Sequence, residues 1–235
     1  MAILSNEQLE ELRQFDTPTI SNAIELFNVR PRTQGFMGPE IKCIVPYDKP
    51  IIGYAVTAKM SALKPPTPEQ NELLIKYYEK VKETTFPTIS VIQDIDPSPI
   101  GSFWGDIQAS IHKALGCVGV ITNGGVRDLD GVKEIDFRFF ASCVLVSHAY
   151  DHLEEINCPV YVGGLTVYPG ELLYADKHGV ISIPHEVAPK LAEACKKVQS
   201  YERVIIDGCR RKFDMGINIQ ELIRLRKEME KLRDM

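Results

Sequence analysis

The chain has 235 residues, of which 44% are hydrophobic and 25% are charged, and these proportions are ordinary for a globular protein. Its formal net charge of −5 excludes an overall positive field that would attract nucleic acid or an anionic membrane. The N-terminus turns polar within a few residues, and no run approaches the roughly 20 apolar residues of a membrane span, so we expect a cytoplasmic protein.

The first part of the chain predicts two short helices followed by a strand. Residues 6–15 carry leucines spaced for one helical face. Thr17 and Pro18 are typical of an N-cap followed by proline at the first helical position, which predicts a second helix from there. Residues 50–60 alternate in polarity and are rich in β-forming residues, so they predict a strand.

The middle of the chain predicts two further helices, each followed by a buried strand. Residues 69–84 and 106–115 have apolar residues at helical spacing, and Gly116 stands where a helix commonly ends in a left-handed residue. Residues 86–93 and 117–122 are short apolar runs, which are typical of strands covered on both faces.

The last part predicts several short strands and then helices. The strands are expected at residues 137–140, 144–147, 160–162 and 179–183, and the helices at 184–200 and 219–233. Because strands and helices do not alternate regularly, the pattern favours a mixed α/β sandwich over a doubly wound sheet. No G-x-G-x-x-G motif follows a strand, so no dinucleotide-binding loop is predicted.

Three charged residues predict a functional site. Asp106 opens one predicted helix, and Arg127 and Asp128 follow the strand after it. The helix advances about 15 Å, and the returning strand covers about 20 Å. Because the two distances nearly cancel, Asp106 should face Arg127 and Asp128. Alone, Asp106 is ordinary in a first helical turn and the Arg-Asp pair is ordinary in a solvated turn, but their convergence favours a site.

The loop before this helix predicts an anion-binding position. It is bordered by glycines and ends at Gly105, and backbone amides from Trp104 to Ile107 lie at the helix N-terminus, where anions bind. Arg127 could grip the same carboxylate with two parallel hydrogen bonds. Asp128 could hold Mg²⁺ or Mn²⁺, ions that often use one or two protein carboxylates and keep several waters. The Trp104 side chain is equally compatible with the core and with the pocket wall.

Other polar residues have simpler interpretations. His112 is predicted on the polar face of its helix, exposed to water. His148 and His152 lie in a polar connector, where a solvated or capping role is expected. Asp176 and Gly179 are predicted to shape a hairpin turn.

The order of these motifs resembles a known family. Asp106, followed after twenty residues by Arg127 and Asp128, resembles the D-x20-R-D signature of the RraA-like family. That family includes the class II 4-hydroxy-4-methyl-2-oxoglutarate aldolases and the regulator of ribonuclease activity A. The similarity extends over residues 10–205, although Asn22 stands where an aspartate is common. Other matching segments are residues 16–23, 53–58 and 167–180.

The resemblance implies a single α/β domain over residues 1–235, built as an αββα-type sandwich of the swivelling β/β/α kind, with a helical extension at about 205–235. It implies homotrimers or homohexamers whose active sites lie between subunits.

For the site residues, the resemblance implies Asp128 as the metal ligand, Arg127 as the clamp for the substrate carboxylate and Asp106 as a ligand through water. In the aldolases a glutamate of the neighbouring subunit completes the metal shell, and Glu202 is the nearest candidate. The aldolase pattern also tends to have an acidic residue three positions after the metal ligand, where this chain has Gly131.

Two classes of function remain open. The first is a divalent-metal-dependent lyase that cleaves a C–C bond of a small 2-oxo acid to give pyruvate, as an aldolase or an oxaloacetate decarboxylase. A water held by Asp106 or Asp128 would move the proton, and the cation would stabilise the enolate charge. The second is a non-catalytic protein-binding regulator of ribonuclease activity. A complete metal shell would distinguish them, so the placement of Glu202 matters most, and we favour the enzyme.

Overall fold

A mixed β-sheet forms the centre of the molecule. The computed structural model describes residues 3–45 and 47–235, and within them this sheet has eight strands. The long strand β2 (Ile51–Ser61) runs parallel to β3 (Thr88–Asp94). β3 is parallel to β4 (Cys117–Thr122), and β4 is parallel to β6 (Arg138–Ala141). These strands are buried nearly throughout, because both faces of the sheet are covered.

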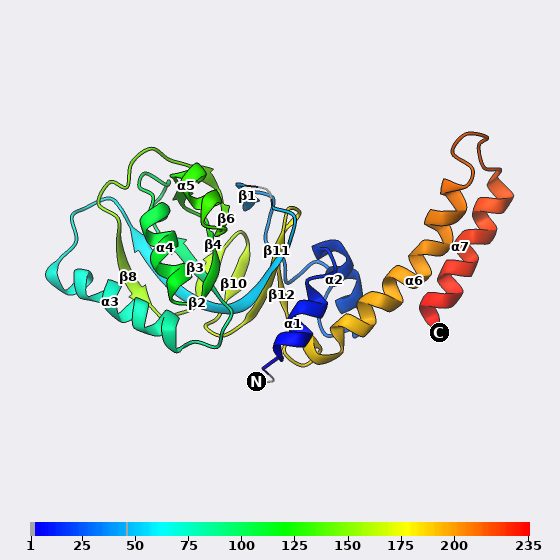
Figure 1. Cartoon of the computed structure of the whole chain (residues 1–235), viewed down its shortest axis with the longest axis horizontal. Helices are drawn as coiled ribbons and strands as arrows, with labels where there is room; N and C mark the ends of the chain where they lie inside the picture. Colours follow the sequence, from blue (N-terminus) through cyan, green and yellow to red (C-terminus); the bar gives the residue numbers. More distant parts are fainter. Residues whose placement is uncertain (1–2, 46) are drawn as a thin grey trace.

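Antiparallel strands lie at both edges of this parallel centre (Figure 1). β11 (Leu172–Asp176) pairs with one half of β2 and forms a hairpin with β12 (Gly179–Ile183). β8 (His152–Ile156) pairs with the other half of β2. β1 (Lys42–Cys43) pairs with β6. The hairpin predicted at Asp176 and Gly179 is confirmed.

Helices cover one face of the sheet. These are α3 (Pro68–Glu83), α4 (Asp106–Ala114) and α5 (Leu129–Glu134) (Figure 1). Tyr77 of α3 and Val132 of α5 are fully buried in the core that they share with the sheet. This layer carries the candidate site, because α4 and α5 both begin at its rim.

A small β-layer covers the other face. β9 (Val160–Val162) and β10 (Leu165–Val167) form a separate antiparallel hairpin. Its valines share a core with Ile89 and Val91 of β3, whereas Ile92 of the same strand faces the helices. The alternation along β3 therefore separates a helical layer from a β-layer, and the expected α/β sandwich is confirmed.

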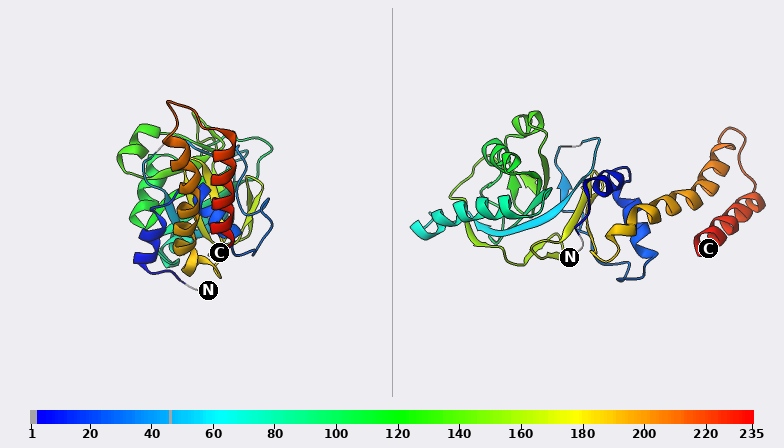
Figure 2. Two further views of the ribbon diagram at one scale, coloured as in Figure 1. Left: turned by 90° about the vertical axis from the view of Figure 1, so that its right-hand side faces the viewer. Right: turned by 60° about the horizontal axis from the view of Figure 1, so that its bottom comes forward.

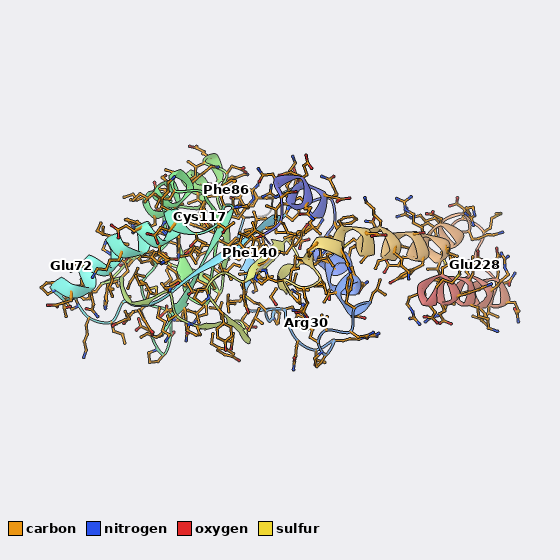
Figure 3. The ribbon with its side chains drawn as sticks, turned by 90° about the horizontal axis from the view of Figure 1, so that it is seen from below. Arg30, Glu72, Phe86, Cys117, Phe140 and Glu228 are labelled. Carbon is orange, nitrogen blue, oxygen red and sulfur yellow. The ribbon has the colours of Figure 1, made fainter. Side chains whose placement is uncertain are left out.

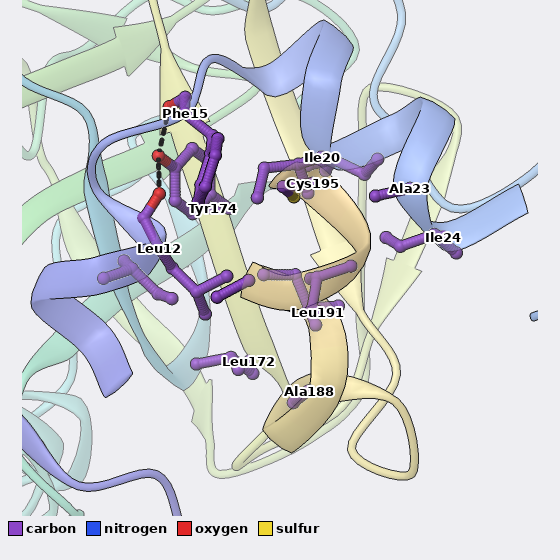
Figure 4. Close-up of a cluster of buried hydrophobic side chains, with 14 of the residues drawn as sticks. Leu12, Phe15, Ile20, Ala23, Ile24, Leu172, Tyr174, Ala188, Leu191 and Cys195 are labelled. Atoms are coloured by element: carbon purple, nitrogen blue, oxygen red, sulfur yellow. Dashed lines mark hydrogen bonds between the residues drawn. The ribbon is translucent and has the colours of Figure 1, made fainter. Parts of the chain in front are cut away.

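A third core joins the N-terminal helices to the edge hairpin. α1 (Asn6–Leu12) and α2 (Thr17–Glu25) pack against β11 and β12 (Figure 4). The Tyr174 hydroxyl donates toward the carbonyl oxygens of Leu12 and Phe15, at 2.9 and 2.6 Å. This contact fixes the end of α1 on the sheet.

The C-terminal helices form a hairpin that stands away from the sheet. α6 (Leu191–Arg210) begins in the third core and runs outward, and α7 (Ile219–Asp234) folds back along it (Figures 1 and 2). Glu72 of α3 and Glu228 of α7 lie at opposite ends of the elongated molecule (Figure 3). No described helix is long and apolar enough to cross a bilayer.

Most predicted elements are confirmed to within two residues, but several boundaries were wrong. The first helix ends at Leu12 instead of residue 15. The N-cap of the second helix is Asp16, whose side chain accepts from the Thr19 amide, because the Thr17 hydroxyl and amide instead bind the Asp176 carboxylate.

The helix predicted at residues 184–200 begins later, at Leu191 after a 3₁₀ turn, and continues to Arg210. The predicted strand at 144–147 ends at Val144, because the backbone beyond it bonds to neighbouring loops.

Several short elements were missed by sequence reasoning. They are α5, β1, β5 (Gly125–Val126), β8, β10 and β11. Each has six residues or fewer, which is too short for hydrophobic periodicity to identify.

Candidate functional site

The start of α4 and the end of β5 meet at one rim of the helical layer. Trp104 and Val126 form a parallel β-bridge, and the Arg127 amide donates to the Trp104 carbonyl oxygen at 2.9 Å. The Asp106 amide lies 3.3 Å from Asp128 Oδ2, to which it donates. The predicted convergence of Asp106, Arg127 and Asp128 is therefore found, and we call this rim the mouth.

Asp128 has an unusual backbone at the mouth. Its φ of 55° and ψ of 43° are left-handed, at the position that begins α5. Non-glycine residues avoid this region, and such exceptions cluster at functional sites. Arg127 Nε lies 3.5 Å from Asp128 Oδ2, and both side chains are about one-third exposed, at 30% and 38%. A small ligand can therefore reach the guanidinium and the carboxylate together.

Gly105 makes this close approach possible. A Cβ at this position would lie under 3.0 Å from Asp128 Oδ2 and 3.2 Å from Arg127 Nε. Gly105 is also the N-cap of α4 and has no side chain to cap it, so the Asp128 carboxylate takes that role at the Asp106 amide. The anion site expected on the amides of residues 104–107 is thus partly filled by the protein's own carboxylate.

Trp104 and Ile107 flank Gly105 and Asp106 in the predicted anion site, and one side chain is buried whereas the other is exposed. The Trp104 side chain is 1% exposed and packs among Phe103, Phe137 and Phe139, so it lies in the core and forms no open wall. Ile107 is 68% exposed, one residue into α4. The mouth therefore has a rigid aromatic base and an exposed apolar rim.

The carboxylates of Asp128 and Asp106 are the donors available for a cation at the mouth. Among the described residues, no group of three or more His, Cys, Asp or Glu side chains could hold a metal ion. A closed four-ligand zinc site is therefore not formed by the described part of one chain. Two hard oxygen donors do suit Mg²⁺ or Mn²⁺, which keep several water ligands.

Gly131 lies one turn into α5, beside Asp106. A Cβ on Gly131 would lie 3.4 Å from Asp106 Cβ and 3.6 Å from its Oδ2, which are ordinary contact distances. A side chain at this position would extend along the Asp106 carboxylate. The glycine therefore leaves open the space that an additional acidic side chain would occupy.

Glu202 lies far from the mouth of its own chain. It belongs to α6, and its Oε1 accepts a hydrogen bond of 3.1 Å from Asn22 Nδ2 of α2. In Figure 1, α6 extends beyond the β11–β12 edge of the sheet, at the end of the molecule away from α4 and α5. One chain alone does not bring Glu202 to Asp128.

Two of the three histidine predictions were wrong. His112 is fully buried, with Nδ1 2.8 Å from the Gln108 carbonyl oxygen and its ring 4.6 Å from that of Trp104. Burial lowers the pKa of His112 to about 4. The face judged polar from α4 alone is covered by aromatic side chains of α3. His152 is also buried, in β8, whereas His148 is exposed as expected.

Comparison with known proteins gives matches over most of the chain. A family model described as "RraA-like: Aldolase/RraA" matches residues 17–182. An uncharacterized protein of Methanocaldococcus jannaschii is 26% identical over 222 residues, 92% of this chain and 95% of that protein.

A Halalkalibacterium halodurans protein named "Putative 4-hydroxy-4-methyl-2-oxoglutarate aldolase" is 30% identical over 109 residues, 44% of this chain and about half, 52%, of that protein's length.

A crystal structure shows the same fold. It is that of Streptomyces coelicolor RraAS2, described as an unusual member of the RNase ES inhibitor RraA protein family. The two chains superpose with a TM-score of 0.68 and 18% identity, over 86% of this chain and 97% of that one. At this identity the likeness concerns the fold.

Proposed function

The chain belongs to the RraA-like family, and from that premise we propose that it is a divalent-metal-dependent lyase that cleaves a C–C bond of a small 2-oxo acid to give pyruvate. The family contains both aldolases and regulators, so membership alone does not decide between them. The observation that carries the proposal is the meeting of Asp106, Arg127 and Asp128 at one partly exposed mouth.

Each residue has a role that its position supports. The exposed part of the Arg127 guanidinium would bind and orient the carboxylate of the 2-oxo acid. Asp128 would hold Mg²⁺ or Mn²⁺ directly, and Asp106 would hold one of its waters. When bound, the cation supplies positive charge that stabilises the negative charge developing on the 2-oxo group as the bond breaks. Gly105 and Ile107 would line the substrate position.

We further propose that the site is completed in a homotrimer or a hexamer of two trimers, by Glu202 of a neighbouring copy. Two observations support this. The mouth is open in one chain, and Glu202 stands on its own chain's far side. Large apolar side chains are also exposed both beside the mouth, such as Val146 at 96%, and on the C-terminal hairpin, such as Phe213 at 75%. A closed ring of identical contacts would complete every site in the same way.

The direct test measures pyruvate released from oxaloacetate and from 4-hydroxy-4-methyl-2-oxoglutarate, with Mg²⁺ or Mn²⁺ and with excess EDTA. We expect turnover that requires the cation and that Asp128→Asn abolishes. Lys133→Gln, an exposed change on the same short helix, is the matched control. Undiminished turnover in EDTA would contradict metal catalysis, and an inert protein with both metals would favour the regulator.

A further inference from the structure

The segment between β7 (Cys143–Val144) and β8 is fixed against both loops of the mouth. The Leu145 amide donates to the Val126 carbonyl oxygen at 3.0 Å, and the Ser102 amide donates to the Ser147 carbonyl oxygen at 2.9 Å. A Cβ on Gly101 would collide with the His148 carbonyl oxygen. The backbone at residues 145–148 is therefore held in contact with the residues that lead to Gly105 and Arg127.

This segment carries an imidazole–carboxylate pair. His148 Nδ1 lies 3.2 Å from Asp151 Oδ1, and the Asp151 amide donates to the His148 carbonyl oxygen at 3.1 Å. The turn between them is tight, since Ala149 has a left-handed φ of 48°. The imidazole is 60% exposed while the carboxylate is only 22% exposed. The pair therefore presents its histidine to ligands and keeps its carboxylate covered.

The Arg127 guanidinium acts electrostatically on the Asp151 carboxylate. Burial raises the pKa of the Asp151 carboxyl, and the neighbouring His148 and Arg127 side chains lower it. Asp151 is thus within electrostatic reach of the Arg127 guanidinium on one side and in contact with the His148 imidazole on the other. The exposed imidazole is therefore carried by a segment whose backbone is bonded to both loops of the mouth.

We propose that His148, oriented by Asp151, is the proton-transfer residue for aldol cleavage at this mouth. The proposal rests on the proposed lyase function and adds a residue to it. A carboxylate at Nδ1 favours the tautomer with its proton on Nδ1 and leaves the Nε2 lone pair facing outward. Imidazole is the side chain most often used for general acid–base catalysis in enzymes.

The step balances without a further reactant. His148 Nε2 takes the proton of the C4 hydroxyl of a 4-hydroxy-2-oxo acid, and the released O–H electron pair forms the C4 carbonyl. The C3–C4 bond breaks, and its electron pair forms the C2–C3 double bond of pyruvate enolate. The imidazolium then returns the proton to C3, which gives pyruvate and a second carbonyl product.

Decarboxylation of oxaloacetate provides the contrast. Its bond-breaking step releases CO₂ and forms the same enolate, but no hydroxyl loses a proton. His148 is therefore needed far more for aldol cleavage than for decarboxylation of oxaloacetate, although both reactions would use Arg127 and Asp128.

The experiment compares both substrates in wild type, His148→Gln and His178→Gln. His178 is the matched control, because its Nδ1 lies 3.1 Å from Asp176 Oδ1 in the distant β11–β12 turn. We expect His148→Gln to lower kcat for aldol cleavage about 100-fold, as for loss of a general base, and decarboxylation by at most a few-fold. His178→Gln should leave both rates as in wild type.

Chemical rescue separates proton transfer from a structural role. Added imidazole should restore aldol cleavage to His148→Ala in proportion to its concentration, and should not stimulate wild type. Wild-type aldol cleavage in His148→Gln, equal loss of both activities, or no rescue would overturn the proposal while leaving the lyase function in place. If wild type released pyruvate from neither substrate, the lyase function itself would fail, and this inference with it.

Discussion

The mouth and the C-terminal hairpin differ in what holds them in place. At the mouth, backbone hydrogen bonds join the loop before α4, the end of β5 and the segment after β7, above the buried Trp104. In the hairpin, the only buried residues past Tyr201 in the described structure are Gly208 and Leu225, which contact each other.

One region is therefore fixed by its own chain. The C-terminal hairpin leaves large apolar side chains exposed, which is typical of an interaction surface.

The largest combined effect on activity and stability is expected from closing the space at Gly105. In Gly105→Ala the new Cβ would collide with the Asp128 carboxylate, and the contact is too close for the side chain to remain in place. We expect metal-dependent activity to fall by at least about 100-fold, with a loss of roughly 1–3 kcal/mol in stability. Steady-state kinetics and denaturant unfolding measure the two.

Gly131→Ala is the matched control for this change. Its Cβ meets Asp106 at ordinary contact distance, and alanine in place of a helical glycine stabilises by up to about 1 kcal/mol. Equal activity losses in the two variants would show that the mouth tolerates no change at all, and would remove the special role of Gly105.

The second prediction joins the two regions. Asp128→Ala and Glu202→Ala should each inactivate the enzyme while leaving its assembly intact. When the two inactive proteins exchange subunits, about one quarter of the sites should pair an intact Asp128 with a neighbour's intact Glu202 and regain activity. Activity after mixing and mass measured by light scattering report the result. A mixture that stays inactive while oligomeric, or a monomeric wild type, would contradict a shared site.

The third prediction concerns the guanidinium of Arg127. Arg127→Lys keeps the charge but loses the planar two-point grip on a carboxylate. The loss should be about 2 kcal/mol in transition-state stabilisation, which is tens-fold in kcat/KM. Arg32→Lys, at a surface ion pair with Glu25, should have no effect. Wild-type kinetics in Arg127→Lys would make this residue an ordinary turn residue.

What was predictable from sequence at the mouth needed only local geometry. Asp106 and Asp128 meet because a helix and a strand run out and back by nearly equal lengths, and rise per residue is a property of the backbone. The mixed sheet followed in the same way from strong apolar runs such as residues 117–122. These predictions did not depend on which side chains from distant parts of the sequence pack against each element.

The features that could not be predicted depend on contacts between residues that are distant in sequence. His112 looked exposed because α4 was judged alone, while Tyr77 and Tyr78 of α3 cover it. The contact of Gly105 with Asp128 appears only when both loops are placed. For Glu202 the partner that we propose belongs to another chain, so the sequence and structure of one chain do not place it.

The fourth prediction concerns His112, which lies beneath the mouth. The C-terminal hairpin contains no histidine. The His112 pKa of about 4 is below the ordinary value of 6.5. Above pH 6.5 the imidazole is neutral in both states. As the pH falls from 6.5 to 4, the unfolded chain binds the proton first, so the folded state loses about 3 kcal/mol of stability.

His112→Phe should remove this loss, because phenylalanine keeps an aromatic ring and does not titrate. Asp94 acts in the opposite direction, since burial raises its pKa to about 6, and the difference between variant and wild type at each pH cancels its contribution. Denaturant unfolding at several pH values gives that difference. Parallel pH curves for His112→Phe and wild type would show that His112 binds its proton equally well in the folded chain.

The smallest effect on the mouth is expected from a change in the hairpin. Leu225 of α7 is buried and packs onto Gly208 of α6, so Leu225→Ala leaves a cavity there, at a local cost of about 2–5 kcal/mol. Because the outer hairpin is held chiefly by its own two helices, this cost should appear as local opening. Amide exchange should rise in α7 and the end of α6 and stay unchanged in β2, β3 and β4. Val132→Ala, beneath the mouth, is the matched change, and it should lower protection across the helical layer and the sheet together. A global loss of protection in Leu225→Ala equal to that in Val132→Ala would show that the hairpin and the mouth unfold as one unit. The two regions would then not differ in how they are held in place.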